Sequence, residues 1–139
     1  MHLKKLKTFA AFLLFFAFTF FTTQAQTIYT CSYTQACSWN SVTEKYDNCI
    51  GGTANTRFEI DKNEKSITQT IQDIKSTFPI LSKQRKNKVT SVYMVKQPNG
   101  ENYYYIIDSK TKEVRILVKK DGIASLTIYS QSDSSYNSD

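Results

Sequence analysis

The last third of the chain alternates between hydrophobic and polar residues. Four alternating segments follow one another at 89–97, 102–108, 113–119 and 123–129. Turn-forming residues separate them, notably Pro98-Asn99-Gly100 and Asp121-Gly122. A period of two is typical of strands with one buried face, and short turns join antiparallel neighbours. This part of the chain therefore predicts an antiparallel meander.

The pattern is less regular before residue 89. Segments 27–33 and 55–61 alternate and predict two strands. Segment 66–74 fits a helix or a strand, and its β-branched residues and the short turn before it favour a strand paired with 55–61. The polar segment 34–53 predicts an irregular loop, and 83–88 predicts a charged loop. Pro79 predicts an edge segment or a connection over 77–82, because proline cannot donate to a ladder.

Together these elements predict an all-β fold. We expect an antiparallel meander of about six to eight strands in a curled sheet, closed as a small barrel or packed as a sandwich. The length fits a single domain over residues 26–130. The serine-rich residues 131–139 predict a disordered tail.

The N-terminal 25 residues predict a cleaved signal peptide. Three lysines precede an apolar run at 8–21, and the small residues Thr23 and Ala25 stand at −3 and −1 of a cleavage site. The alternatives are an uncleaved membrane anchor and a buried helix, but the run is shorter than the ~20 residues needed to span a bilayer. We therefore expect a protein exported to the periplasm or the extracellular space, with no membrane span after cleavage.

Cleavage changes the chemistry of the chain. It removes the single histidine, His2, and leaves 15 basic and 12 acidic residues. The four glycines match neither a phosphate-binding loop nor a dinucleotide motif. Without an imidazole or a recognisable nucleophile motif, we expect no enzyme, no cofactor and no bound metal. The small net charge gives little support for a nucleic-acid partner.

Aromatic residues are the most suggestive candidates for a binding function. All nine tyrosines and the single tryptophan lie after residue 25. Tyrosine and tryptophan are favoured at recognition surfaces, although strands also favour tyrosine for packing alone. We expect a ligand-binding sheet face for a small molecule, a glycan or a protein. Its candidate residues are Tyr93, Tyr103, Tyr105 and Trp39.

Three cysteines remain in the exported chain, so one disulfide and one free thiol are expected. Pairing Cys37 with Cys49 would close a loop of about a dozen residues, and pairing Cys31 with Cys49 is nearly as plausible. If Cys31 is the free thiol, it could be buried, could join two chains in a disulfide-linked dimer, or could react as a nucleophile. Three cysteines lack the usual fourth ligand of a zinc site.

Two groups of charged residues complete the candidates. Glu59 and Asp61 share one face of a predicted strand, where alternation places them in solvent rather than in a catalytic pair. Four cations crowd the segment 83–88, which we expect to be a solvated loop. Its alternative role is contact with nucleic acid, an anionic lipid surface or an acidic glycan. These cations are Lys83, Arg85, Lys86 and Lys88.

Four features occur together in this chain: the Gln24-Ala25-Gln26 cleavage region, the early Cys31 and Cys37 with Trp39, the Phe58-x-Ile60 strand and the tyrosine-rich hairpin 92–105. With these features the chain resembles the short secreted all-β proteins of Bacteroidota-type bacteria. The resemblance implies export and an all-β fold, but no activity, because the function of that group is largely unknown. The sequence therefore predicts a non-catalytic binding module. The first alternative is a structural protein linked through a free cysteine, and the second is an enzyme that works without histidine.

Overall fold

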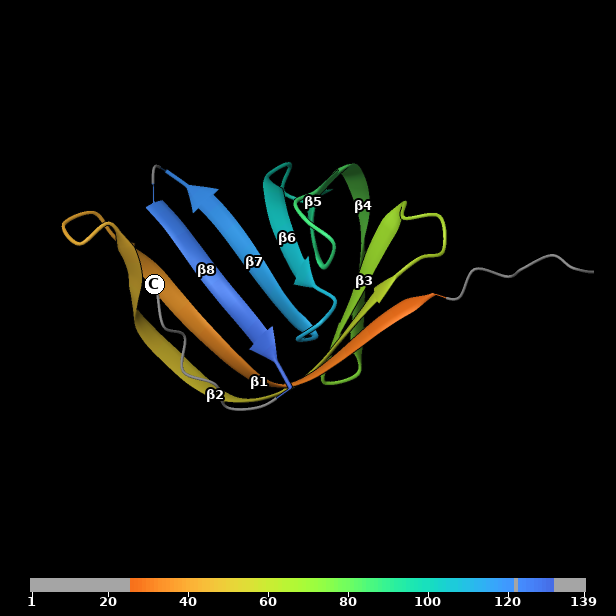
Figure 1. Cartoon of the computed structure of the whole chain (residues 1–139), viewed down its shortest axis with the longest axis horizontal. Helices are drawn as coiled ribbons and strands as arrows, with labels where there is room; N and C mark the ends of the chain where they lie inside the picture. Colours follow the sequence, from red (N-terminus) through yellow and green to blue (C-terminus); the bar gives the residue numbers. More distant parts are fainter. Residues whose placement is uncertain (1–25, 122, 132–139) are drawn as a thin grey trace, which may run out of the picture.

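The protein is an eight-stranded antiparallel β-barrel (Figure 1). The computed structural model describes residues 26–121 and 123–131. Each strand pairs with its neighbours in sequence, and the first pairs with the last. The all-β prediction is confirmed, with a barrel rather than a sandwich. The strands are β1 Thr27–Asn40, β2 Lys45–Ile60, β3 Ser66–Ile71, β4 Ile74–Arg85, β5 Thr90–Lys96, β6 Asn102–Asp108, β7 Glu113–Lys120 and β8 Ile123–Ser130.

Two of the predicted segments fall largely outside this description. The predicted signal peptide, residues 1–25, lies outside the described residues. So does the predicted tail, apart from Gln131.

The connections alternate between the two ends of the barrel, because every strand runs antiparallel to the next. One end holds the β2–β3, β4–β5 and β6–β7 connections together with the start of β1. We call it the basic end, after its lysines and arginines. The other holds the β3–β4, β5–β6 and β7–β8 connections, and we call it the open end.

The middle of the barrel is filled by buried side chains. Phe58 is fully buried and meets the rings of Tyr105 and Tyr129 edge-on, with centroids 6.3 Å and 5.0 Å apart. Such edge-to-face contacts add to the stabilisation from burying the rings. Because these buried side chains separate the two ends of the barrel, each end is a separate candidate site. The buried cluster comprises Tyr29, Cys31, Phe58, Ile60, Ile67, Tyr93, Val95, Tyr105, Ile107, Val114 and Ile116.

The prediction of a loop over 34–53 is wrong. β1 continues to Asn40 and β2 begins at Lys45, so most of the segment is a long hairpin. Its pairing shifts register between Cys31 and Tyr33 and again between Ala36 and Ser38. Such bulges interrupt alternation, which hides a strand from a period-two analysis. In Figure 1, β1 bends close to the end of β8, and from Tyr33 onward it pairs with β8.

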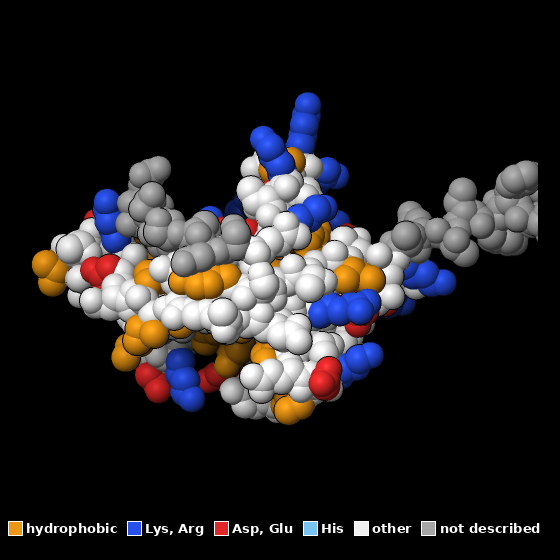
Figure 2. Space-filling view, turned by 90° about the horizontal axis from the view of Figure 1, so that it is seen from below, with side chains coloured by type: hydrophobic (Ala, Val, Ile, Leu, Met, Phe, Trp, Pro, Cys, Tyr) orange, Lys and Arg blue, Asp and Glu red, His pale blue; other side chains and the backbone are white. Residues whose placement is uncertain are grey.

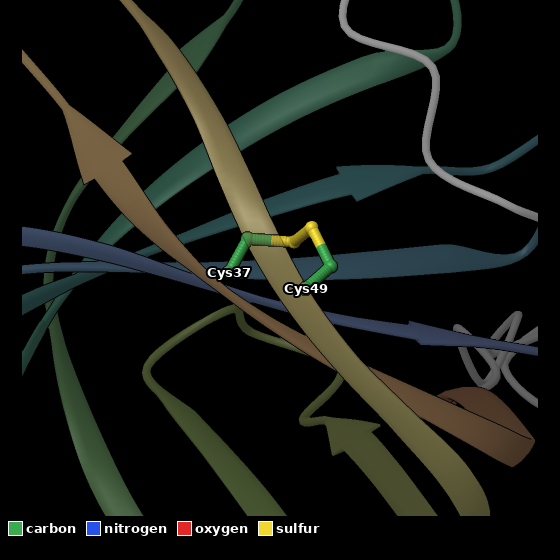
Figure 3. Close-up of a disulfide and its surroundings, with 2 residues drawn as sticks. All are labelled: Cys37 and Cys49. Carbon is green, nitrogen blue, oxygen red and sulfur yellow. A yellow bond between two sulfur atoms is a disulfide. The ribbon is translucent and has the colours of Figure 1, made fainter.

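A second buried cluster lies on the outer face of this bent sheet. Leu117 belongs to it and stands between two interior residues of β7, so it points away from the barrel interior. It lies beside Leu126, which in turn pairs with Cys37. Cys37 is joined to Cys49 by a disulfide between β1 and β2, with an S–S distance of 2.00 Å (Figure 3). The disulfide thus fixes the long hairpin beside β8.

The region around Pro79 is a strand rather than a connection. Ile80 donates its amide to Lys65 beside β3, so the proline nitrogen faces the β5 side. Pairing of β4 with β5 starts only at Ile80, and the missing donor is therefore tolerated. The predicted charged loop is also shorter than expected, because Lys83 and Arg85 belong to β4.

Candidate functional site

The inner face of the β3–β4 hairpin extends beyond the filled core at the open end. Ile67 pairs with Phe78 in the core, and two residues further along each strand Gln69 pairs with Ser76 on the same face. The next pair on this face is Ile71 with Ile74, which are 42% and 72% exposed. Two inward-facing isoleucines therefore lack the neighbours that cover the rest of the interior row.

A cavity of about 360 Å³ lies along this face. Its walls are mainly apolar, with amide and hydroxyl groups between them, and none of the described residues that line it is charged. Its volume falls within the range of about 300–1,000 Å³ that is common for small-molecule sites. We call it the open-end groove. It is lined by Gln69, Ile71, Gln72, Ile74, Ser76 and Phe78.

Buried tyrosine hydroxyls support the inner part of the groove. The Tyr105 hydroxyl donates a hydrogen bond to Gln69 Oε1 at 3.3 Å. Burial raises the pKa of Tyr105 and of Tyr129, so both hydroxyls stay protonated. The amide nitrogen of Gln97 is buried beside the Tyr105 hydroxyl and makes no well-formed hydrogen bond among the described residues. The hydrogen bond from Tyr105 orients the Gln69 amide at the groove.

The hairpin turn that carries the groove has an unusual sequence. Gln72 and Asp73 both have positive φ, 47° and 69°. A two-residue turn of this kind normally contains asparagine or glycine. The sequence carries no signal for this turn because neither residue is present, so alternation alone does not predict that Ile71 and Ile74 are partners across a hairpin.

A second cavity, of about 200 Å³, lies at the basic end. Tyr93, predicted as a binding residue, forms part of its wall and donates a hydrogen bond to Glu64 Oε1 at 2.9 Å. Lys83 pairs with the same carboxylate at 2.5 Å and lies over the Tyr93 ring. The hydrogen bond from Lys83 is the main cause of a lowered pKa at Glu64. Figure 2 shows Lys and Arg side chains beside the start of β1.

The four predicted binding residues do not share one surface. Tyr93 reaches the basic end, whereas Tyr105 is buried in the centre and Tyr103 packs half-buried against it. Trp39 is 41% exposed on the long hairpin, where its ring meets Tyr46 edge-on. Tyr105 touches the open-end groove only through Gln69.

The free thiol belongs to Cys31, which is 1% exposed. Burial, together with the negative charge of Glu113, raises its pKa to about 11, so the thiol stays protonated at neutral pH. A nucleophilic role has no support from this environment.

The carboxylates Glu59 and Asp61 interact with different partners and do not form a pair. Glu59 pairs with Arg57 at 2.7 Å, and Asp61 accepts a hydrogen bond from the Lys65 amide. In the described ranges, no three His, Cys, Asp or Glu residues are grouped so as to hold a metal ion.

Comparison with known proteins gives no relative. No family model, curated protein or solved structure matches the chain. Within residues 26–121 and 123–131, no helix is long and apolar enough to cross a membrane.

Proposed function

We propose that the protein is an exported, non-catalytic binding module that holds one small, mainly apolar molecule in the open-end groove. The observation that carries this proposal is the exposure of Ile71 and Ile74 on the inner face of a barrel. Together their exposed parts amount to roughly one isoleucine side chain. Covering them would contribute about 2 kcal/mol to binding.

The polar groups of the groove indicate what else the ligand carries. Gln69, Gln72 and Ser76 offer amide and hydroxyl groups, and the described part of the chain places no charged side chain in the lining of the groove. An ionised ligand would lose its hydration there without a partner. We therefore assign an uncharged ligand with one or two groups that form hydrogen bonds.

The buried Cys31 favours this function over the disulfide-linked alternative. A thiol that is 1% exposed is out of reach of a cysteine on a second chain. The N-terminal segment supports the exported location, and the Cys37–Cys49 disulfide suits an oxidising compartment.

A fluorescence titration tests the proposal. The probe is N-phenyl-1-naphthylamine, an uncharged fluorophore, and the variants are Ile74→Lys and Ile50→Lys. Ile74 and Ile50 are similarly exposed, 72% and 80%, but only Ile74 lines the groove. We expect saturable one-to-one binding that Ile74→Lys weakens at least tenfold and Ile50→Lys leaves unchanged. Equal weakening by both variants would show adsorption to exposed apolar residues and refute the proposal.

A further inference from the structure

Lys83 and Arg85 face the interior of the basic end because of a bulge. Ile80 pairs with Val95 on the inner face, but Ser82 pairs with Met94 and Lys83 with Tyr93. β4 therefore has one extra residue at this point, which reverses its alternation. Without the bulge, Lys83 would face solvent. Bulges are common beside functional sites, where they redirect side chains.

The loop that follows β4 is fixed by its own hydrogen bonds. The Arg85 guanidinium donates to the carbonyls of Asn87 and Lys88 at 3.2 Å and 3.0 Å. The side chain of Asn87 accepts from the amides of Val89 and Thr90 at 2.9 Å and 2.8 Å. Arginine carries five N–H donors, so Arg85 keeps others for a ligand while its position is held.

The cavity at this end has an excess of positive charge. Lys83, Arg85 and Lys88 line it, and Glu64 is the one carboxylate among the described residues of its lining. Among the described residues, neither Arg85 nor Lys88 has a carboxylate within 4.0 Å. These four groups leave two positive charges without a counter-charge.

Three other acidic residues at the basic end interact with groups outside the cavity. Asp61 accepts from the Lys65 amide, and Asp108 accepts from the amides of Lys110 and Thr111. Glu113 is paired with Arg115. None of these three carboxylates lines the cavity, and among the described residues none lies within 4.0 Å of a cation that lines it.

We propose that the basic end is a second binding site, which takes a phosphate or sulfate monoester group between Arg85, Lys88 and Lys83. A doubly charged phosphate ester balances both excess charges, and a sulfate ester, with one negative charge, balances one of them. Arginine matches the tetrahedral oxyanion of either ester with paired donors. Ser91 and Ser109 also line the cavity, and the Ser109 hydroxyl donates to the Val89 carbonyl at 3.1 Å. Its volume of about 200 Å³ is below that of common small-molecule sites and suits a terminal group rather than a whole ligand.

Isothermal titration calorimetry at constant ionic strength tests this site. The probes are glucose 6-phosphate and glucose 6-sulfate, with glucose as the uncharged control. We expect one-to-one binding of the esters and none of glucose. Arg85→Gln should weaken binding about tenfold and Lys88→Gln about fivefold. Lys88 is exposed, so its replacement leaves the fold intact.

Two further variants separate a built site from general attraction. Glu64→Gln removes the carboxylate that competes for Lys83, so it should tighten ester binding about fivefold. Lys96→Gln makes the same charge change as Lys88→Gln but lies on β5 towards the open end, and should have no effect. Weaker binding in Glu64→Gln, or equal losses in Lys96→Gln and Lys88→Gln, would overturn the proposal.

Dextran sulfate, with dextran as control, identifies the source of the group. Tighter binding of dextran sulfate than of glucose 6-sulfate, with the same response to Arg85→Gln, would assign an ester carried on a polysaccharide. Equal or tighter binding of the small esters would assign a free ester. Absence of saturable binding by every ester would refute the site.

Discussion

The Cys37–Cys49 disulfide is expected to contribute a large part of the stability of the barrel. Replacing both cysteines with alanine removes a cross-link between residues separated by 12 positions. On the chain-entropy model a loop of this length gives about 3 kcal/mol. The disulfide also connects β1 to a part of β2, Lys45–Thr53, that has no β3 partner. The free energy of unfolding should therefore fall by about 3 kcal/mol, and Tm by roughly 10–20 °C.

Urea unfolding, followed by the fluorescence of Trp39, measures this loss. Trp39 lies two residues from Cys37, so it reports on the affected hairpin. Wild-type protein treated with a phosphine reductant is the matched control and should unfold at the same urea concentration as the double variant. A loss below about 1 kcal/mol would contradict the reasoning, because the unfolded chain would then gain little freedom from breaking the cross-link.

Three further predictions follow from the burial and backbone of single residues. Cys31 should resist iodoacetamide in the native protein and react fully in urea, as mass spectrometry would show; rapid native labelling would contradict its burial. Asp73→Gly should raise the free energy of unfolding by about 0.5–1 kcal/mol in urea titrations, because glycine adopts positive φ without strain; a loss of stability would refute this. Burial raises the pKa of Tyr93 and Tyr105 above 10.0 in the folded state only, so their contribution to stability is complete below pH 10 and declines above it. An absorbance titration of the native protein at 295 nm should show a group of tyrosines that ionises at higher pH than the others, and this difference should disappear in urea. Ionisation of all tyrosines near their usual pKa in the native protein would contradict the burial of Tyr93 and Tyr105.

The meander from β5 to β8 could be predicted from sequence because two independent signals agree there. Alternation marks the strands, and residues such as Asn99-Gly100 mark the turns. The long hairpin of β1 and β2 could not, because its bulges interrupt the alternation and its outer face is buried by Leu126 and Ile128 from a distant strand. Closure of the barrel depends on this hairpin, so the sequence alone does not distinguish a barrel from a sandwich.

The sites were harder to predict than the fold. The sequence predicts Tyr93 and Tyr105 as binding residues. Alternation along the strands does not show that both side chains point into the barrel, or that they approach different ends of it. The local sequence predicts that Lys83 and Arg85 are solvated. The bulge in β4 that turns them inward depends on pairing with β5, which the local sequence does not reveal. Ile74 has no local signal at all, since its place at the groove follows from the β3–β4 turn.

The most direct test of the proposed function is a methyl NMR titration of isoleucine-labelled protein with N-phenyl-1-naphthylamine. The account predicts large chemical-shift changes at Ile71 and Ile74, which line the groove. Ile28 and Ile50, exposed elsewhere on the barrel, serve as internal controls and should stay unchanged. Shifts at Ile50 or Ile28 without shifts at Ile71 and Ile74 would contradict the assignment of the open-end groove as the binding site.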